Sequence, residues 1–185
     1  MTIAIKPTAS GSTIEQDGST ILTVDGSGNI DVANNLTSTG NLYPKVPTFS
    51  ALFGTDQSFS TTTWTKIQYN TEDFDTNSNY DSSTNYRFTP TVAGYYQVNA
   101  NIRLNYSGSA GDGTYLALYK NGSAWNVTSR LNVTSLYGSL SLSSLVYLNG
   151  STDYIEMYGY TNHSSPFFDQ NGAVPSRFSA HLVSV

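Results

Sequence analysis

The most constraining feature of this chain is a strict alternation of apolar and polar residues over residues 96–105. Beginning at Tyr96, the even positions are apolar and the odd positions carry Gln, Asn or Arg. A period of two places successive side chains on opposite faces, which is typical of an antiparallel strand with one buried face. We therefore predict a long central strand whose inward residues are Val98, Ala100, Ile102 and Leu104.

A tight corner is predicted directly before this strand. Pro90 has no backbone N–H group to donate, so we expect strand pairing to end near Thr89 and Pro90. Gly94 supplies the backbone freedom that a corner needs. The sequence thus indicates one strand that ends at residue 88, a corner, and the start of the central strand.

Short apolar segments separated by turn signals continue this plan across residues 48–185. Asn121-Gly122 and Asn149-Gly150 are typical of tight turns between paired strands. No window shows helical periodicity, so we predict an all-β head built as a ten-stranded jelly-roll sandwich. Polar loops are expected at residues 70–85 and 163–175. The other predicted strands are residues 49–53, 64–69, 86–88, 115–120, 138–148, 153–160 and 177–185.

Residues 1–47 form a separate predicted region, an N-terminal anchor segment with a linker. Its apolar runs between residues 13 and 32 are short and are separated by Asp17-Gly18 and Asp25-Gly26, a strong β-hairpin signal. Runs of this length cannot bury a sheet face alone, so we expect other chains or a docking surface to order them. The alternative is a disordered leader. The predicted anchor residues are Ile14, Ile21, Leu22, Val24, Ile30 and Val32.

Charge and composition exclude several classes of function. The net charge is −5, whereas binding to the phosphates of nucleic acid needs a basic surface. No apolar run approaches the roughly 18 residues that span a membrane, and no Cys is present for disulfides or thiolate metal sites. The N-terminus lacks the basic and apolar regions of a secretion signal. We therefore expect an extracellular role to follow release by lysis, as part of a virus particle.

Catalytic and metal-binding patterns are weak, and we predict that the protein is not an enzyme and needs no cofactor. Neither histidine has the spacing of a metal site; we expect His163 in a polar loop and His181 facing away from the core. No Gly-x-Ser-x-Gly nucleophile motif occurs, and the acidic residues 72–75 fit a solvated loop better than a glycosidase pair. A calcium site built from loop oxygens is a candidate, with Asp112, Asp153 and Asp169 left unassigned.

Aromatic residues in loops and on polar strand faces are the remaining candidates for function. Tyr and Phe are enriched in subunit interfaces. An exposed Tyr or Trp beside Asn or Asp also offers a sugar ring an apolar platform with amide hydrogen bonds nearby. The predicted interface or ligand-contact residues are Tyr95, Trp125, Tyr137, Tyr158, Tyr160, Phe167 and Phe168.

A series of motifs occurs in a fixed order across residues 48–185. It comprises Phe49-Ser50-Ala51, a polar segment with Asn70, Phe74 and Asn79-Tyr80-Asp81, Phe88-x-Pro90-x-x-x-Gly94-Tyr95-Tyr96-x-Val98, Leu118-x-x-Asn121-Gly122, Val146-x-Leu148 leading to Asp153-x-Ile155, and Phe178-Ser179-Ala180-x-Leu182. In this order the motifs resemble the globular head domain of complement component 1q, which shares its jelly roll with tumour necrosis factor. The resemblance implies a ten-stranded jelly roll assembled as a tight trimer about a threefold axis. Some members of the family carry calcium near the trimer apex.

The N-terminal part of this chain differs from the animal members of that family. It lacks a signal peptide, Cys and a collagen-like Gly-x-y stalk. The Asp-Gly hairpin segment found in that place is similar to the leaders of small structural proteins of tailed bacteriophages.

Together these observations predict a bacteriophage virion structural protein on the virion surface. It would be a homotrimeric appendage, such as a short head fibre, a capsid decoration protein or a tail-fibre knob. Its N-terminal segment would dock to other virion proteins, and its head would face outward for host adhesion, with a surface glycan as a candidate ligand. The alternative is a soluble lectin-like or complement-like recognition module of a cell. An enzyme that acts on polysaccharide is the least favoured hypothesis.

Overall fold

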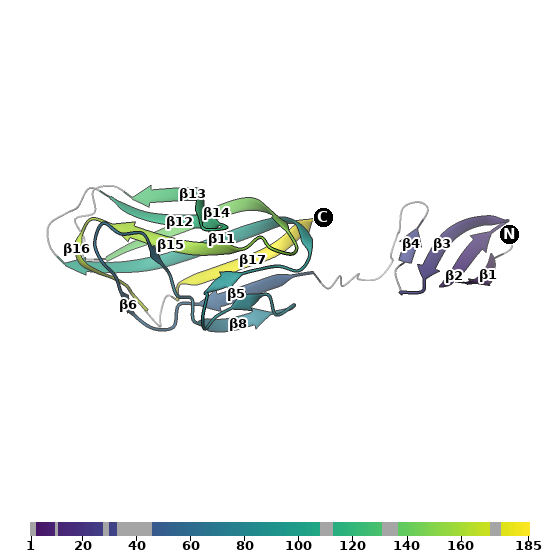
Figure 1. The fold of residues 1–185 in the computed structure, drawn as a ribbon, viewed down its shortest axis with the longest axis horizontal. Coiled ribbons are helices and arrows are strands. Elements are labelled where there is room, and N and C mark those ends of the chain that lie inside the picture. The colour runs from purple at the N-terminus through teal and green to yellow at the C-terminus, as the bar shows by residue number, and fades with distance from the viewer. Residues whose placement is uncertain are drawn as a thin grey trace. The chain divides into compact units, whose positions relative to one another are not determined.

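Figure 1 shows the computed structural model of the chain, which describes residues 3–9, 11–27, 30–32, 46–107, 113–130, 137–170 and 175–185. The chain separates into two units, Met1–Pro44 and Lys45–Val185, which we call the N-terminal unit and the head. The described residues of both units form strands, turns and loops, and none of them is helical. Accordingly, they include no helix that is long and apolar enough to cross a membrane.

The N-terminal unit is an antiparallel sheet in which each strand pairs with the next one along the chain. Asp17 and Gly18 have φ angles of 50° and 82° and form a two-residue hairpin turn, so the predicted hairpin signal is confirmed. The first strand is not among the predicted ones; it contains Pro7, which is tolerated here because the strand lies at the sheet edge. The strands are β1 (Ile3–Thr8), β2 (Gly11–Gln16), β3 (Ser19–Asp25) and β4 (Ile30–Val32).

One sheet of the head is built around β11 (Ala93–Ser107), the predicted central strand, and we call it the β11 sheet. On one side β11 pairs with β14 (Tyr137–Asn149). On its other side it pairs with β16 (Ser164–Phe168) and β17 (Arg177–Ser184). The sheet is completed by β5 (Thr48–Leu52), β6 (Gln57–Ser58) and β8 (Thr71–Asp75).

The second sheet of the head, which we call the β12 sheet, faces the first one (Figure 1). Its central strands are β12 (Thr114–Lys120) and β15 (Ile155–Thr161), which pair antiparallel. Strand β12 also pairs with the edge strand β13 (Ser123–Arg130). The remaining strands are β7 (Thr65–Lys66), β9 (Tyr80–Asp81) and β10 (Arg87–Phe88).

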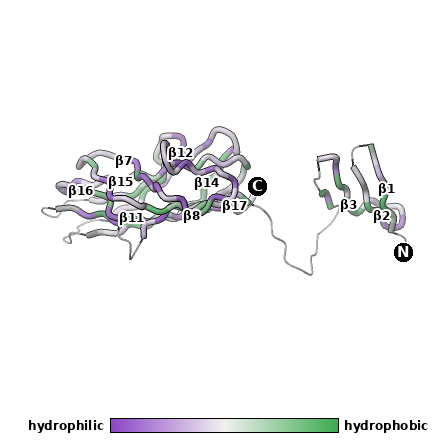
Figure 2. Tube along the Cα trace, turned by 90° about the horizontal axis from the view of Figure 1, so that it is seen from below, coloured by the Kyte–Doolittle hydropathy of each residue, from purple (hydrophilic) through white to green (hydrophobic). Residues whose placement is uncertain are grey.

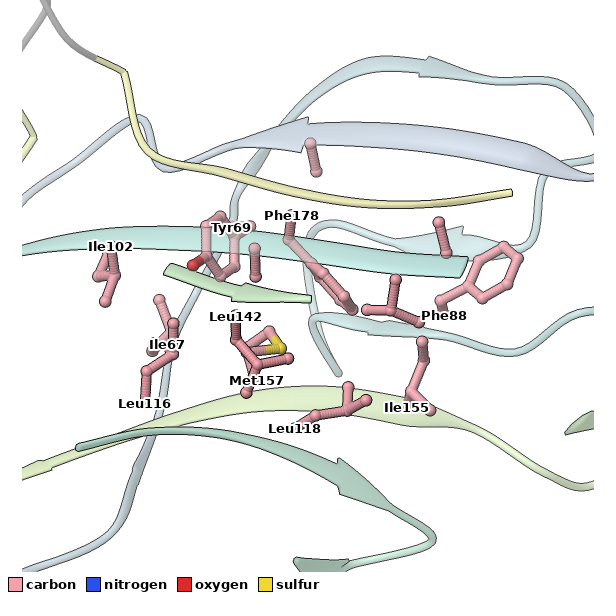
Figure 3. Close-up of a cluster of buried hydrophobic side chains, with 14 of the residues drawn as sticks. Ile67, Tyr69, Phe88, Ile102, Leu116, Leu118, Leu142, Ile155, Met157 and Phe178 are labelled. Atoms are coloured by element: carbon pink, nitrogen blue, oxygen red, sulfur yellow. The ribbon is translucent and has the colours of Figure 1, made fainter. Parts of the chain in front are cut away.

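The core of the head lies between these two sheets. The even-numbered residues of β11 from 96 to 104 face inward and are buried, so the predicted alternation is confirmed. Figure 3 shows side chains of both sheets meeting across this space, among them Leu116, Leu118, Ile155 and Met157 from the β12 sheet and Ile102, Leu142 and Phe178 from the β11 sheet.

A cluster of aromatic side chains lies within this core. Phe49 stacks on Tyr80 and Phe88 with ring centroids 4.6 and 4.5 Å apart, and it meets Phe178 edge to face at 4.9 Å. The hydroxyl of Tyr80 donates to the carbonyl oxygen of Tyr69 at 2.9 Å. Burial raises the pKa of Tyr80 well above its usual value, so this phenol stays neutral within the core.

The corner before β11 forms as predicted. Strand β10 ends at Phe88 and β11 begins at Ala93, with Pro90 between them. Gly94 has a φ of 155°, and a Cβ at this position would lie 2.4 Å from the carbonyl oxygen of Ser184. The close approach of β17 therefore requires glycine at this position.

Two segments predicted as polar loops contain strands. Residues 70–85 include β8 and β9, and residues 163–175 include β16. Pro166 argues against a strand, but β16 is held in place because Phe168 packs into the core with its ring 4.2 Å from that of Phe59.

The two histidines lie in different environments. His163 lies in the short loop between β15 and β16, as predicted, but it is buried there, and its backbone N–H donates to Thr161 Oγ1 at 3.2 Å. His181 is exposed and faces away from the core, as predicted.

Candidate functional site

The N-terminal unit carries an apolar row that crosses all of its strands. Strand register pairs Ile5 with Ile14, and Ile14 with Leu22. Leu22 pairs in turn with Val32. Because directly paired residues share one face of a sheet, these four side chains line up on the same side. Figure 2 shows hydrophobic positions along β1, β2 and β3.

This apolar face is uncovered in the single chain. Val24 pairs with Ile30 two residues along from the apolar row and extends the same face. None of the N-terminal side chains that the structure describes is buried, and Ile5 and Ile30 are 72% and 64% exposed. The face contains the predicted anchor residues apart from Ile21, which is the extra residue of a β-bulge.

A second exposed apolar surface lies on the outward face of the β11 sheet, near its β14 edge. Tyr95 pairs with Tyr147, and their rings meet edge to face at 5.4 Å. Leu145 of β14 lies on the same outward face, and Val183 of β17 is the extra residue of the β-bulge beside Tyr95. These four side chains and Trp125 of β13 are 44–57% exposed. We call these five residues the edge cluster.

Lys120 joins the two sheets at this edge. Its Nζ lies 5.6 Å from the ring centroid of Trp125 and 5.9 Å from that of Tyr147. It also forms an ion pair with Asp153 at 3.0 Å. Asp153 accepts a hydrogen bond from Asn121 Nδ2 at 2.7 Å, and this bond, together with Lys120, holds the pKa of Asp153 below its usual value. Residues of two different sheets are thereby held close together.

The neighbouring part of the same outward face is polar. It contains a hollow of about 500 Å³. Phe74 of β8, which is 48% exposed, lies on this outward face as well, away from the edge cluster. The polar residues that line the hollow are Asn99, Asn101, Ser141, Ser143, Arg177 and Ser179.

The β12 sheet carries a group of aromatic side chains on its own outward face. The ring centroid of Trp64 lies 5.4 Å from that of Tyr160, 6.1 Å from that of Tyr115 and 6.0 Å from that of Tyr119. Tyr119 stacks in turn on Tyr158 with centroids 4.1 Å apart. We call these five residues the aromatic platform.

A hollow of about 300 Å³ opens beside Trp64, Tyr115 and Tyr160. Ala117 lies between Tyr115 and Tyr119 on the outward face of β12 and pairs with Tyr158, and it is fully buried among these larger side chains. Trp64 itself remains 37% exposed. The platform therefore presents aromatic surface to a ligand in this hollow.

An ion pair lies beside the platform. Lys66 of β7 and Glu156 of β15 form it, and both are largely withdrawn from solvent. The hydroxyl of Tyr158 donates to Glu156 Oε2 at 3.4 Å. Burial, and then the negative charge of Glu156, raise the pKa of Tyr158 to about 12. The phenol is therefore neutral at physiological pH, and the two charges beside it balance each other.

The predicted interface or ligand-contact residues fall into both surfaces. Tyr95 and Trp125 belong to the edge cluster, whereas Tyr158 and Tyr160 belong to the aromatic platform. Trp64, Tyr115 and Tyr119 of the platform are missing from the prediction. A signal for the two tyrosines was present, because Tyr115, Ala117 and Tyr119 alternate with Leu116 and Leu118 and therefore share one strand face.

Three predicted residues lie elsewhere. The prediction for Phe168 is wrong, because its side chain is fully buried in the core and cannot contact a partner or ligand. Phe167 is only partly buried and pairs with Asn105 of β11. The side chain of Tyr137 lies outside the described residues.

The acidic residues considered for calcium lie in separate ion pairs. Asp153 pairs with Lys120, and Asp169 pairs with Arg103 at 2.9 Å. Asp112 lies outside the described residues. Within the part of the chain that the structure describes, no three His, Asp or Glu side chains are grouped as a metal site would require.

Comparison with known proteins addresses the fold. No protein-family model and no curated protein matches the sequence. The globular domain of the zebrafish complement 1qA protein matches with a TM-score of 0.55 at 16% identity, over 74% of this chain and 97% of that chain. Eiger TNF from S. frugiperda gives 0.57 at 11% identity, over 76% and 94%. The PRD1 vertex protein P5 gives 0.54 at 13% identity, over 77% and 100%.

The head has the jelly-roll fold of complement 1q and tumour necrosis factor domains. The predicted fold class is therefore confirmed. At 11–16% identity the likeness concerns the fold alone, so the role of this chain has to be argued from its own surfaces.

Proposed function

We propose that this protein is a homotrimeric surface appendage of a bacteriophage virion, anchored by its N-terminal unit and exposing its head. The observation that carries the proposal is the uncovered apolar face of the N-terminal unit, on a chain whose head has a core of its own. An exposed apolar patch of this kind is typical of a docking surface. The fold that the head shares with the PRD1 vertex protein P5 supports a place on a virion.

Trimerisation of the head is the second part of the proposal. The edge cluster brings half-exposed Tyr, Trp and Leu side chains to one edge of the sandwich, and Tyr and Trp are enriched in subunit interfaces. Burial of this apolar area would favour association by about 25 cal/mol per Å². The resemblance to the complement 1q family supports three copies. Three heads also repeat any weak surface site and so raise avidity.

Contact with the host surface is the proposed purpose of the exposed head. The aromatic platform and its hollow lie on the outward face of the β12 sheet and support a recognition role. A soluble recognition module of a cell would use the same platform, which is why it remains the second candidate. The two candidates differ in the N-terminal unit, because only the virion protein needs it for docking.

Deletion of residues 1–45 in the phage that encodes the chain separates the two candidates. Full-length and truncated proteins would carry a C-terminal tag, and purified particles would be examined by immunoblot and by immunogold electron microscopy. We expect the full-length protein on the particle surface. The truncated protein should fold and assemble but should be missing from particles. Equal incorporation of both proteins would contradict the anchor, and absence of the full-length protein from particles would favour the soluble module.

A further inference from the structure

We infer that the hollow beside the aromatic platform binds a neutral hexopyranose unit of a glycan. The inference deepens the proposed contact between the head and the host surface and rests on it. Ring geometry, local charge and the rigid attachment of Trp64 carry the argument.

The rings of the platform form one continuous surface rather than a cage. The centroids of Trp64, Tyr115 and Tyr160 lie 5.4–6.1 Å apart, so each ring contacts the other two. An aromatic cage for a quaternary ammonium ion needs space between its rings, because the cation sits over their faces. Rings in mutual contact leave no such space. A ligand must therefore lie against the platform, in the hollow of about 300 Å³.

A hexopyranose matches this kind of surface. One face of the sugar ring carries C–H groups that pack on the electron-rich face of an aromatic ring, while hydroxyl groups project from its edge. Tyr115 and Tyr160 are only partly buried, and neither phenol is hydrogen-bonded to another described residue. Their hydroxyl groups can therefore exchange hydrogen bonds with a sugar that lies against Trp64.

The local charge favours a neutral sugar over an anionic one. Lys66 and Glu156 beside the platform form an ion pair, so the cation is already neutralised. Single-stranded nucleic acid also stacks on aromatic side chains, but it requires a positively charged groove for its backbone. The net charge of −5 opposes such a ligand.

Trp64 is held in place by backbone hydrogen bonds on both sides. The N–H of Thr62 donates to the carbonyl oxygen of Thr161 at 2.7 Å. The N–H of Ile67 donates to the carbonyl oxygen of Met157 at 2.9 Å, and β7, which lies between Thr62 and Ile67, pairs with β15. A platform that is already ordered loses little conformational entropy when it binds, which suits a small and weakly bound ligand.

The platform stays accessible in the proposed trimer. It lies on the outward face of the β12 sheet, whereas the edge cluster lies on the outward face of the β11 sheet and at the edge formed by β13 and β14. Association through the edge cluster would therefore leave the hollow open. Three weak sites on one appendage would act together on a surface that displays many copies of the sugar.

Tryptophan fluorescence tests the site, because the chain has only Trp64 and Trp125. In the full-length Trp125→Phe variant, Trp64 is the sole indole. We expect a saturable fluorescence change with at least one of four neutral probes, namely maltotriose, cellotriose, lactose and chitotriose. Calorimetry should show that Trp64→Ala and Tyr160→Ala weaken this binding by about tenfold or more. The control Phe74→Ala removes an exposed aromatic ring from β8 and should leave binding unchanged.

Several results would overturn the inference. One is the absence of a saturable response to all four saccharides. Another is a saccharide affinity that is unchanged in the Trp64→Ala variant. Tighter binding of sialylated or sulfated saccharides, of a polyproline peptide or of tetramethylammonium would also overturn it, because each indicates a different ligand chemistry. A monomeric chain that binds sugar through Trp64 would refute the proposed trimer and keep the site. A trimer that is present on particles without sugar binding would keep the proposed function and remove the site.

Discussion

The head and the N-terminal unit are both antiparallel, but they reach stability in different ways. In the head two sheets face each other, and side chains such as Phe49 and Ile102 are fully buried between them. In the N-terminal unit a single sheet aligns Ile14 with Leu22, yet none of the side chains described there is buried. Strand pairing can therefore align apolar side chains on one face of a sheet without burying them in a core. The difference supports the proposal that the N-terminal unit is the part of the chain that docks to a partner.

This difference has an energetic consequence. Full burial of a Val, Leu or Ile side chain contributes about 1.5–3 kcal/mol, and a row that is only half-buried gains part of that amount. A small sheet without a second layer is marginally stable in water. We therefore expect the head to unfold cooperatively by itself and the N-terminal unit to gain most of its stability from its partner.

The largest effect is expected from Phe49→Ala. Its ring contacts Tyr80, Phe88 and Phe178, so truncation leaves a cavity in the core and should lower the unfolding free energy of the head by about 3–5 kcal/mol. Urea unfolding followed by tryptophan fluorescence measures this loss, because both tryptophans lie in the head. The exposed Phe74 is the matched control, and Phe74→Ala should change stability by less than about 0.5 kcal/mol. Similar losses of unfolding free energy in Phe49→Ala and Phe74→Ala would contradict the burial of Phe49 in the core.

Gly94→Ala should have the next largest effect, a loss of about 2 kcal/mol from backbone strain and from the clash with Ser184. The same urea experiment measures it. Ala93→Ser at the exposed neighbouring position is the control and should stay within about 0.5 kcal/mol of the unmodified chain. An unchanged midpoint for Gly94→Ala would mean that the corner is not constrained as described.

Asp153→Asn should cost about 1 kcal/mol at pH 7, because the carboxylate that accepts from Asn121 and pairs with Lys120 is lost. The pKa of Asp153 is lowered in the folded state, so its carboxylate stabilises the head above the unfolded pKa of about 3.9 and loses this effect as pH falls through the lower, folded value. Urea midpoints of the two proteins should therefore converge in strong acid. A difference that is constant with pH would refute this role.

Ile14→Ala should have the smallest effect on the purified chain, with a loss below about 1 kcal/mol that is confined to the N-terminal unit. Amide hydrogen exchange in β2 and β3 measures this local change, and the urea midpoint of the head should not move. On assembled particles the same substitution should reduce incorporation. A loss as large as that of Phe49→Ala would show that the apolar row is already buried in the free chain.

The parts of the fold that depend on local pattern were predictable. Strand β11 follows from its alternation, and the corner follows from Pro90 and Gly94, because both signals arise from the backbone itself. Strands β1 and β16 were not predictable from local pattern, because Pro7 and Pro166 argue against strands. Their pairing depends on neighbours that only the folded chain brings together.

The candidate site was predictable in part for the same reason. In β12, Tyr115 and Tyr119 share the strand face opposite to Leu116 and Leu118, which indicates an outward face with aromatic side chains. The reach of Trp64 across that face depends on the pairing of β7 with β15, which no local pattern shows. For Phe168 the error has the opposite sign: this residue lies in a segment predicted as a loop, and it was therefore predicted as a surface contact, but its ring packs into the core.

Sedimentation equilibrium of the purified full-length chain tests most directly the claim that the heads associate through the edge cluster. We expect a trimer at micromolar concentration. Leu145→Glu should produce monomers that keep their β-sheet circular dichroism, because this half-exposed side chain is dispensable for the fold, whereas an unpaired charge in the interface is costly. A stable monomer of the unmodified chain, or a Leu145→Glu chain that remains trimeric, would contradict the account.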